Sequence, residues 1–268
     1  MFKMVEPYPL LAAGIAVAIS VFTITLIYGF SWGIPRHTTT GIRLRLFGMA
    51  GSALLSTLFL HLGGFITACE LIPSIEYSFE LFLETMLLPL GITIILLTGP
   101  IVDRAMSKSV FTAPSHYQVH EKFRSYIAAP VIEEYLYRFL LSSLLLKSFS
   151  VEYTILIQAI LFSLSHAHHH YMALLRSGSC DWSQLGVHTL STFLFGLYSG
   201  FLYVRCKSIV CLSLIHGFCN WINVPRFSRL WSKFYKTFAT FFGLMSATVL
   251  LYFFGNDYTR YRALIPCK

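Results

Sequence analysis

Charged side chains are scarce in this sequence, because Asp, Glu, Lys and Arg together make up only 12% of its 268 residues. A soluble globular domain carries about twice that share. Hydrophobic residues reach 56%, aromatic residues reach 16%, and the mean hydropathy is +0.66. The composition therefore excludes an ordinary soluble domain and indicates a membrane protein.

Several familiar sequence signatures are also missing. The six cysteines include no CxxC pair, which argues against a disulfide framework and against a zinc knuckle. No HExxH motif of a zinc protease is present. No segment repeats with a period of about 20–50 residues. We therefore predict a single membrane-embedded domain over residues 1–268.

Apolar runs of about 20 residues, the length that crosses a bilayer, account for most of the chain. The expected fold is all-α and polytopic, with about eight transmembrane helices. The runs lie at residues 9–30, 46–68, 80–102, 125–146, 151–167, 185–204, 208–223 and 237–255.

The net charge of +8 comes from basic residues in the short segments between these runs. This placement indicates a positive-inside topology, and we expect no nucleic acid partner. Lys and Arg are more frequent after the first, third, fifth and seventh runs than on the other side. The rule places those connections in the cytosol, and both termini outside the cell or in a lumen.

The fourth run contains three charged residues, Glu133, Glu134 and Arg138. Each charge at the centre of a spanning helix costs about 2.5–3.5 kcal/mol on insertion scales. Glu134 and Arg138 are four residues apart and share a helix face, so they can form an ion pair. Glu133 points about 100° away from Glu134. We therefore predict that the motif separates into a structural ion pair, Glu134–Arg138, and a lone carboxylate, Glu133.

Two further runs carry polar residues at helical spacing. Phe162 and His166 are four residues apart near the end of the fifth run, and His216 and Asn220 are four apart near the end of the seventh. These two runs cross the membrane in the direction opposite to the fourth. We therefore expect Glu133, His166, His216 and Asn220 to lie at one level, in the cytosolic half of the membrane.

This set of side chains suits the hydrolysis of an amide bond. A carboxylate in an apolar cavity can act as a general base. A neighbouring imidazole can help to polarise a water molecule. A second histidine and an amide can donate hydrogen bonds to the oxyanion of a tetrahedral intermediate.

Three motifs on successive runs carry a family resemblance. "EEYLYR" fits E-E-x-x-x-R, "FSLSH" fits F-x-x-x-H, and "HGFCN" fits H-x-x-x-N. In this order they resemble the CAAX prenyl endopeptidases of the Rce1 type, within the CPBP group of intramembrane proteases. The motif-bearing part covers about 125–223, whereas the first three runs and the last match only in being apolar.

The resemblance implies an intramembrane catalytic cavity in the endoplasmic reticulum membrane, accessible from the cytosol. It implies removal of the C-terminal aaX tripeptide from farnesylated or geranylgeranylated CaaX proteins such as small GTPases. Glu133 and His166 would activate water, and His216 and Asn220 would stabilise the oxyanion. The supporting residues would be Glu134, Arg138 and Phe162.

Two alternative functions use the same residues. A zinc-dependent protease would bind the metal through Glu133, His166 and His216, whereas the leading hypothesis needs no cofactor. A transporter or proton channel would use Glu133 and the histidines as a relay. Such a protein is expected to contain an inverted repeat with broken helices, and the sequence shows none.

The remaining histidines have simpler interpretations. We interpret His168, His169 and His170 as an interfacial run beside the site, because consecutive helical residues point in different directions. His116 and His120 have a ligand-like spacing but are expected in a polar loop.

Two features inside the runs point to packing. His61 and His188 are interpreted as hydrogen-bonded packing residues. Gly196 and Gly200 form a small-xxx-small pattern, which predicts a close helix–helix contact.

Overall fold

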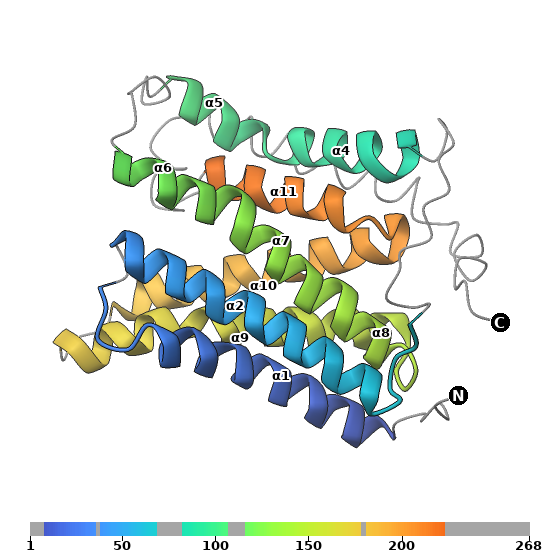
Figure 1. Cartoon of the computed structure of the whole chain (residues 1–268). Coiled ribbons are helices and arrows are strands. Elements are labelled where there is room, and N and C mark those ends of the chain that lie inside the picture. The colour runs from blue at the N-terminus through green and yellow to red at the C-terminus, as the bar shows by residue number, and fades with distance from the viewer. Residues whose placement is uncertain (1–7, 36–37, 69–81, 107–115, 178–180, 223–268) are drawn as a thin grey trace.

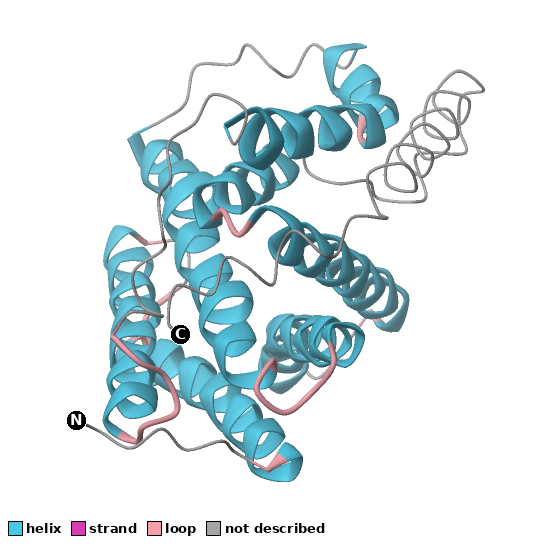
Figure 2. Cartoon of the chain, turned by 90° about the vertical axis from the view of Figure 1, so that its right-hand side faces the viewer, coloured by secondary structure: helices cyan, strands magenta, loops and turns pink. Residues whose placement is uncertain are grey.

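The computed structural model describes residues 8–35, 38–68, 82–106, 116–177 and 181–222 (Figure 1). Every regular element within these ranges is helical, as Figure 2 also shows, so the all-α prediction is confirmed. In chain order the elements are α1 (Pro9–Phe30), α2 (Thr39–Leu62), η2 (Leu83–Leu87), α4 (Leu88–Leu96), α5 (Thr98–Met106), α6 (His116–Phe123), η4 (Arg124–Ala128), α7 (Ala129–Glu134), η5 (Tyr135–Leu140), α8 (Leu141–Leu145), α9 (Val151–Ser177), α10 (Trp182–Cys206) and α11 (Ile209–Ile222), where η denotes a π-helical segment.

Local sequence signals explain several helix ends. The Thr38 hydroxyl accepts a hydrogen bond from the Gly41 amide at 3.0 Å and caps α2. Asp181 caps α10 by accepting from the Gln184 amide, also at 3.0 Å. Such side-chain caps satisfy backbone donors that the first helical turn leaves unpaired. After α10, Lys207 adopts a left-handed conformation with φ 49°, which ends the helix before α11 begins.

Helices lie on the predicted apolar runs of the described residues, whereas the number of about eight transmembrane helices stays a prediction. Helices α1, α2 and α10 are long and apolar enough to cross a membrane, and Leu83–Leu96 and Ile209–Ile222 are shorter apolar helices. The chain is thus an all-α membrane protein. The predicted run at 237–255 lies outside the described residues.

Two sequence predictions about helix boundaries were wrong. The fifth run, predicted to end at residue 167, continues as α9 to Ser177, because no proline or glycine interrupts the segment. His116 and His120 were predicted in a loop but lie on α6, which continues directly into the motif-bearing segment. A polar composition therefore did not mark a loop at this position.

The segment from α6 to α8 runs through the middle of the described helices without a break (Figure 1). Helix α11 packs against η4 and α7 of this central segment. Helix α2 contacts the same segment at α6, η4, α7 and η5. The π-helical segments η4 and η5 flank α7. Interruptions of this kind are frequent at functional sites, and α7 carries both Glu133 and Glu134.

Helices α9 and α10 approach closely through small residues. A Cβ atom added at Gly196 would lie 2.9 Å from the Cα of Ala159, and one at Gly200 would lie 3.2 Å from Cγ2 of Ile155. The close contact predicted from the two glycines is confirmed. This contact sets the positions of α9 and α10, and α9 carries the F-x-x-x-H motif.

Candidate active site

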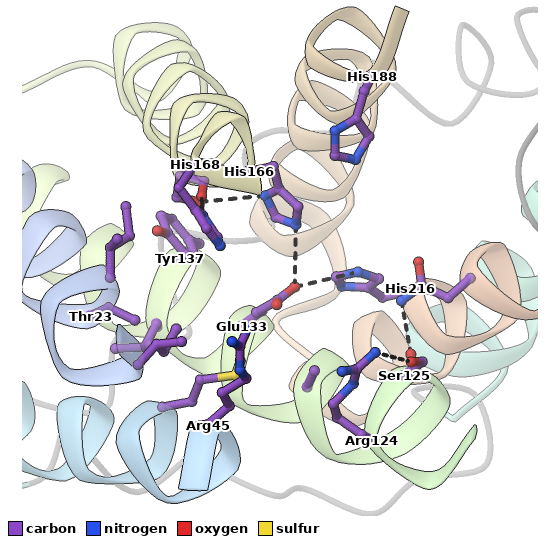
Figure 3. Close-up of a pocket in the computed structure, with 17 residues that line it drawn as sticks. Thr23, Arg45, Arg124, Ser125, Glu133, Tyr137, His166, His168, His188 and His216 are labelled. Carbon is purple, nitrogen blue, oxygen red and sulfur yellow. Dashed lines mark hydrogen bonds and ion pairs between the residues drawn. The ribbon is translucent and has the colours of Figure 1, made fainter. Parts of the chain in front are cut away.

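A cavity of about 400 Å³ opens between the helices that carry the three motifs (Figure 3). Its walls come from α1, α2 and the central segment, and from α9, α10 and α11. The lining residues are Thr23, Ile24, Ile27, Arg45, Met49, Arg124, Ser125, Ala129, Glu133, Leu136, Tyr137, Ser165, His166, His168, His188, His216 and Asn220. The structure therefore brings Glu133, His166, His216 and Asn220 together, as the span directions predicted.

Glu133 lies at the centre of this constellation. Its side chain is 20% exposed, and its Oε2 atom lies 3.9 Å from Nε2 of His166 and 3.6 Å from Nε2 of His216. Figure 3 shows the carboxylate pointing to both rings. Both distances exceed that of a direct hydrogen bond. Three polar atoms from three separate helices thus face one another inside the cavity.

The backbone of α9 determines how His166 is oriented. Its Nδ1 lies 2.8 Å from the carbonyl oxygen of Phe162, one turn earlier. Because a carbonyl only accepts, Nδ1 must carry the proton, and Nε2 of the neutral ring presents a lone pair to the cavity. The Phe162 ring packs against the imidazole, with centroids 4.4 Å apart. The F-x-x-x-H motif therefore holds a proton acceptor at a defined angle.

His216 is oriented by a carboxylate instead. Its Nδ1 donates to Oε1 of Glu134 at 2.8 Å, and its Nε2 faces Glu133. The rings of Phe162 and Phe195 pack against it, with centroid distances of 5.9 and 4.7 Å. A charge-assisted hydrogen bond of this length fixes both the tautomer and the position of the ring.

The predicted Glu134–Arg138 ion pair is present, and both side chains are fully buried. The Nε atom of Arg138 lies 3.3 Å from Oε2 of Glu134 and donates to the Ser199 hydroxyl at 2.7 Å. The guanidinium carbon lies 4.7 Å from the centroid of the Phe162 ring. The pair therefore joins the central segment to α9 and α10.

The predicted division of this motif into an ion pair and a separate carboxylate is confirmed, but the sequence did not show that Glu134 also contacts His216. Glu134 contacts Arg138 through one oxygen and His216 through the other. Helix geometry within a single segment relates Glu134 to Arg138, but it contains no information about α11. The ion pair consequently belongs to the site, because it holds the carboxylate that orients His216.

Asn220 lies on α11, one turn beyond His216. Its Nδ2 donates to the backbone carbonyl of Ser125 in η4 at 2.9 Å. A Cβ atom added at Gly217 would lie only 2.1 Å from the carbonyl oxygen of Tyr126. The glycine of the HGFCN motif therefore allows α11 to lie directly against η4, which brings His216 and Asn220 to the cavity.

The sequence analysis missed several residues of the cavity wall. His188 was interpreted as a packing residue, yet it lines the cavity, with its ring centroid 6.0 Å from that of His166. Arg45 and Arg124 directly precede the predicted runs 46–68 and 125–146, but both line the cavity. No signal within one helix could have revealed this placement, since it depends on how α2, η4 and α10 pack around α7.

Two further histidines that the sequence analysis interpreted, His61 and His168, have defined contacts in the structure. His61 lies 3.2 Å from the carbonyl oxygen of Ile66 through its Nδ1, which agrees with its interpretation as a packing residue. His168 lines the cavity beside the site and packs edge-on against Tyr28, with centroids 5.3 Å apart. Across the described ranges, no three His, Cys, Asp or Glu side chains are arranged to hold a metal ion.

Comparison with known proteins shows which family and which relatives this chain resembles. Residues 118–222 match the family described as "Type II CAAX prenyl endopeptidase Rce1-like". The chain is 34% identical over 125 residues to CAAX prenyl protease 2 of Arabidopsis thaliana. This match covers 44% of this chain and 38% of that protein. No solved structure matches the chain.

Two further relatives have the same name. CAAX prenyl protease 2 of Homo sapiens is 25% identical over 193 residues, or 65% of this chain and 57% of the relative. CAAX prenyl protease 2 of Saccharomyces cerevisiae is 28% identical over 171 residues, which make up 58% of this chain and 54% of the relative. The chain thus matches about half of the length of these two relatives.

The matched segment begins on α6 and ends with α11, so it contains all three motifs and the ion-pair partners of Glu133 and Glu134 given above, His166, His216 and Arg138. Neither a transporter nor a zinc protease is favoured by these similarities. Residues 118–222 are therefore similar to the Rce1-like family of type II CAAX prenyl endopeptidases.

Proposed function

We propose that this protein is an intramembrane endopeptidase that removes the aaX tripeptide from farnesylated or geranylgeranylated CaaX proteins. The observation that carries the proposal is the position of the Glu133 carboxylate, whose Oε2 faces Nε2 of His166 at 3.9 Å and Nε2 of His216 at 3.6 Å. The match of this segment to prenyl endopeptidases supports the choice of substrate class.

The first chemical step is the activation of water. A water molecule held between Glu133 and His166 transfers a proton to the carboxylate, and its oxygen attacks the scissile carbonyl carbon. His166 accepts the second hydrogen bond of that water, since the Phe162 carbonyl keeps the lone pair of Nε2 directed into the cavity. The product of this step is a tetrahedral intermediate with a negatively charged oxygen.

The oxyanion then requires hydrogen-bond donors. We assign this role to Nε2 of His216 in its protonated form and to one N–H of the Asn220 side-chain amide. The other N–H of that amide donates to the backbone carbonyl of Ser125. Glu134 stabilises the imidazolium through Nδ1. When the C–N bond breaks, Glu133 returns its proton to the leaving amine of the tripeptide, so the carboxylate is regenerated.

The proposal is tested by incubating the purified protein with a prenylated CaaX peptide and with its unprenylated twin. We expect release of the tripeptide from the prenylated peptide and far weaker cleavage of the other, because each buried CH₂ contributes about 0.8 kcal/mol of membrane affinity. Equal cleavage of both peptides would contradict the substrate class. Loss of activity with a chelator, restored by zinc, would instead support a zinc protease.

The proposal also includes a location, the endoplasmic reticulum membrane, with the cavity open to the cytosol where CaaX proteins are made. The positive-inside distribution of Lys and Arg supports this orientation. A cysteine at Ala167, in a variant without other reactive cysteines, should react with an impermeant thiol reagent added to the cytosolic face of intact microsomes. Reaction only after the lumenal face is opened would show the inverse orientation.

A further inference from the structure

Two arginines outside the three motifs line the cavity, Arg45 on α2 and Arg124 in η4. Arg45 is buried, with a relative exposure of 7%. The Arg124 side chain is 18% exposed, donates to the Ser125 hydroxyl at 3.2 Å, and lies 3.8 Å from Oε1 of Glu121. Figure 3 shows both arginines on the side of Glu133 away from His166.

The cavity wall contains two arginines and one carboxylate, and Glu121, which pairs with Arg124, is not among the lining residues. Among the lining residues, Glu133 is the single carboxylate and the two arginines are the fixed cations. The imidazoles of His166, His168 and His188 occupy the opposite part of the wall (Figure 3). Guanidinium groups therefore line the cavity on the arginine side of the carboxylate, where they would stabilise an anionic group of a ligand.

We propose that Arg45 and Arg124 form a subsite for the free C-terminal carboxylate of the substrate. This inference rests on the proposed function, and it adds the direction in which the peptide lies across Glu133. The guanidinium group presents N–H donors in a planar fork that fits a carboxylate. Three extended residues span at most about 10 Å, so the terminus of an aaX segment remains near a cavity of about 400 Å³.

The subsite would explain how the enzyme selects the peptide bond that precedes the last three residues of the substrate. With the carboxylate held by the arginines, the bond that lies over Glu133 is the one that precedes the last three residues. The prenylated cysteine then lies on the far side of Glu133. An internal Cys-containing sequence lacks the terminal carboxylate and would bind less well.

The experiment compares two prenylated CaaX peptides that differ only at the C-terminus, one a free acid and the other a carboxamide. For the wild type we expect kcat/KM to be about 10- to 100-fold higher for the acid, as a hydrogen-bonded charged group implies. Arg45→Gln and Arg124→Gln should each lower kcat/KM for the acid by about tenfold or more and leave that for the carboxamide within about twofold. Arg45→Lys should retain part of the preference.

Arg43→Gln is the matched control, because Arg43 lies on the same helix, is exposed and does not line the cavity. It should not change the preference for the acid. If Arg45→Gln fails to fold, the wild-type preference and its loss in Arg124→Gln still decide the question. Equal cleavage of acid and carboxamide by the wild type would overturn the subsite while leaving the proposed function intact, whereas no cleavage of either would overturn the proposed function.

Two other roles for the arginines predict different results. If they stabilised the oxyanion, their loss would slow both peptides equally, which would contradict the subsite. If they bound a lipid phosphate, the wild type would not distinguish the peptides, and its activity would depend on anionic lipid in vesicles of phosphatidylcholine with or without phosphatidylserine. Dependence of the acid preference on both arginines, in phosphatidylcholine alone, would support the carboxylate subsite.

Discussion

Glu133 and Glu134 are adjacent residues of the same type, yet the structure places them in opposite environments. Glu133 faces the cavity with 20% of its side chain exposed, and its nearest histidine nitrogens lie 3.6 and 3.9 Å away. Glu134 is fully buried and contacts His216 at 2.8 Å and Arg138 at 3.3 Å. The same chemical group can therefore be exposed to a reaction cavity or held as part of the scaffold, depending on what surrounds it.

The physical difference lies in whether the oxygens have permanent partners. The oxygens of Glu134 are engaged by side chains that close contacts hold in place, including an arginine with a further bond to Ser199. Glu133 has room around Oε2, so it can exchange a proton with a water molecule and a substrate. A carboxylate already neutralised by an arginine would be a poor base.

The largest effect on turnover is expected for Glu133→Gln. The amide has nearly the same volume but cannot accept a proton from water, so cleavage should fall by about 10²–10⁴-fold. The melting temperature should remain close to that of the wild type, because the ion pairs of Glu133 within the described part of the chain are long, at 3.6 and 3.9 Å. Activity above a tenth of wild type at equal protein levels would remove Glu133 from the mechanism.

Glu134→Ala should lower stability and activity together. It leaves Arg138 buried without its carboxylate, and removal of one partner of a buried pair typically costs about 3–5 kcal/mol. It also removes the acceptor of the His216 Nδ1 proton. A lower melting temperature and reduced cleavage are both expected; normal thermal stability without activity would show that Glu134 acts in the chemistry itself.

Gly217→Ala tests whether close contact between α11 and η4 positions the site. The added Cβ would collide with the Tyr126 carbonyl, so α11 must move and take His216 and Asn220 with it. Overpacking of this kind costs about 1–3 kcal/mol, and kcat should fall more than stability alone would explain. Gly186→Ala, where a Cβ would meet nothing within 4 Å, is the control and should leave cleavage unchanged.

The smallest effect on turnover is expected for Ser199→Ala. This change removes the hydroxyl that accepts from Nε of Arg138, and hydrogen bonds to charged groups contribute about 1.5–3 kcal/mol. Unfolding should therefore occur at a lower temperature, while cleavage stays within a few-fold of wild type because Glu134 keeps both of its partners. A loss of cleavage as large as that of Glu133→Gln would mean that the two regions are not separable.

Much of the fold follows from the chain's local composition. Apolar runs determine where α1, α2, α10 and α11 lie, because a helix is the structure that satisfies its own backbone in lipid. The spacing of Glu134 and Arg138 predicted their ion pair, and Gly196 and Gly200 predicted the close contact of α9 with α10. These features depend on residues within one segment, where helical periodicity relates sequence to space.

The sequence by itself also predicted which residues carry the proposed chemistry, since Glu133, His166, His216 and Asn220 stand out as polar groups in apolar runs. Only the tertiary structure decided that Glu134 orients His216, that Gly217 lets α11 contact η4, and that Arg45 and Arg124 face the cavity. The physical reason is that each of these depends on how a residue of one helix meets another element. Helical periodicity determines the direction of a side chain around its own axis, whereas packing between helices determines what it meets there.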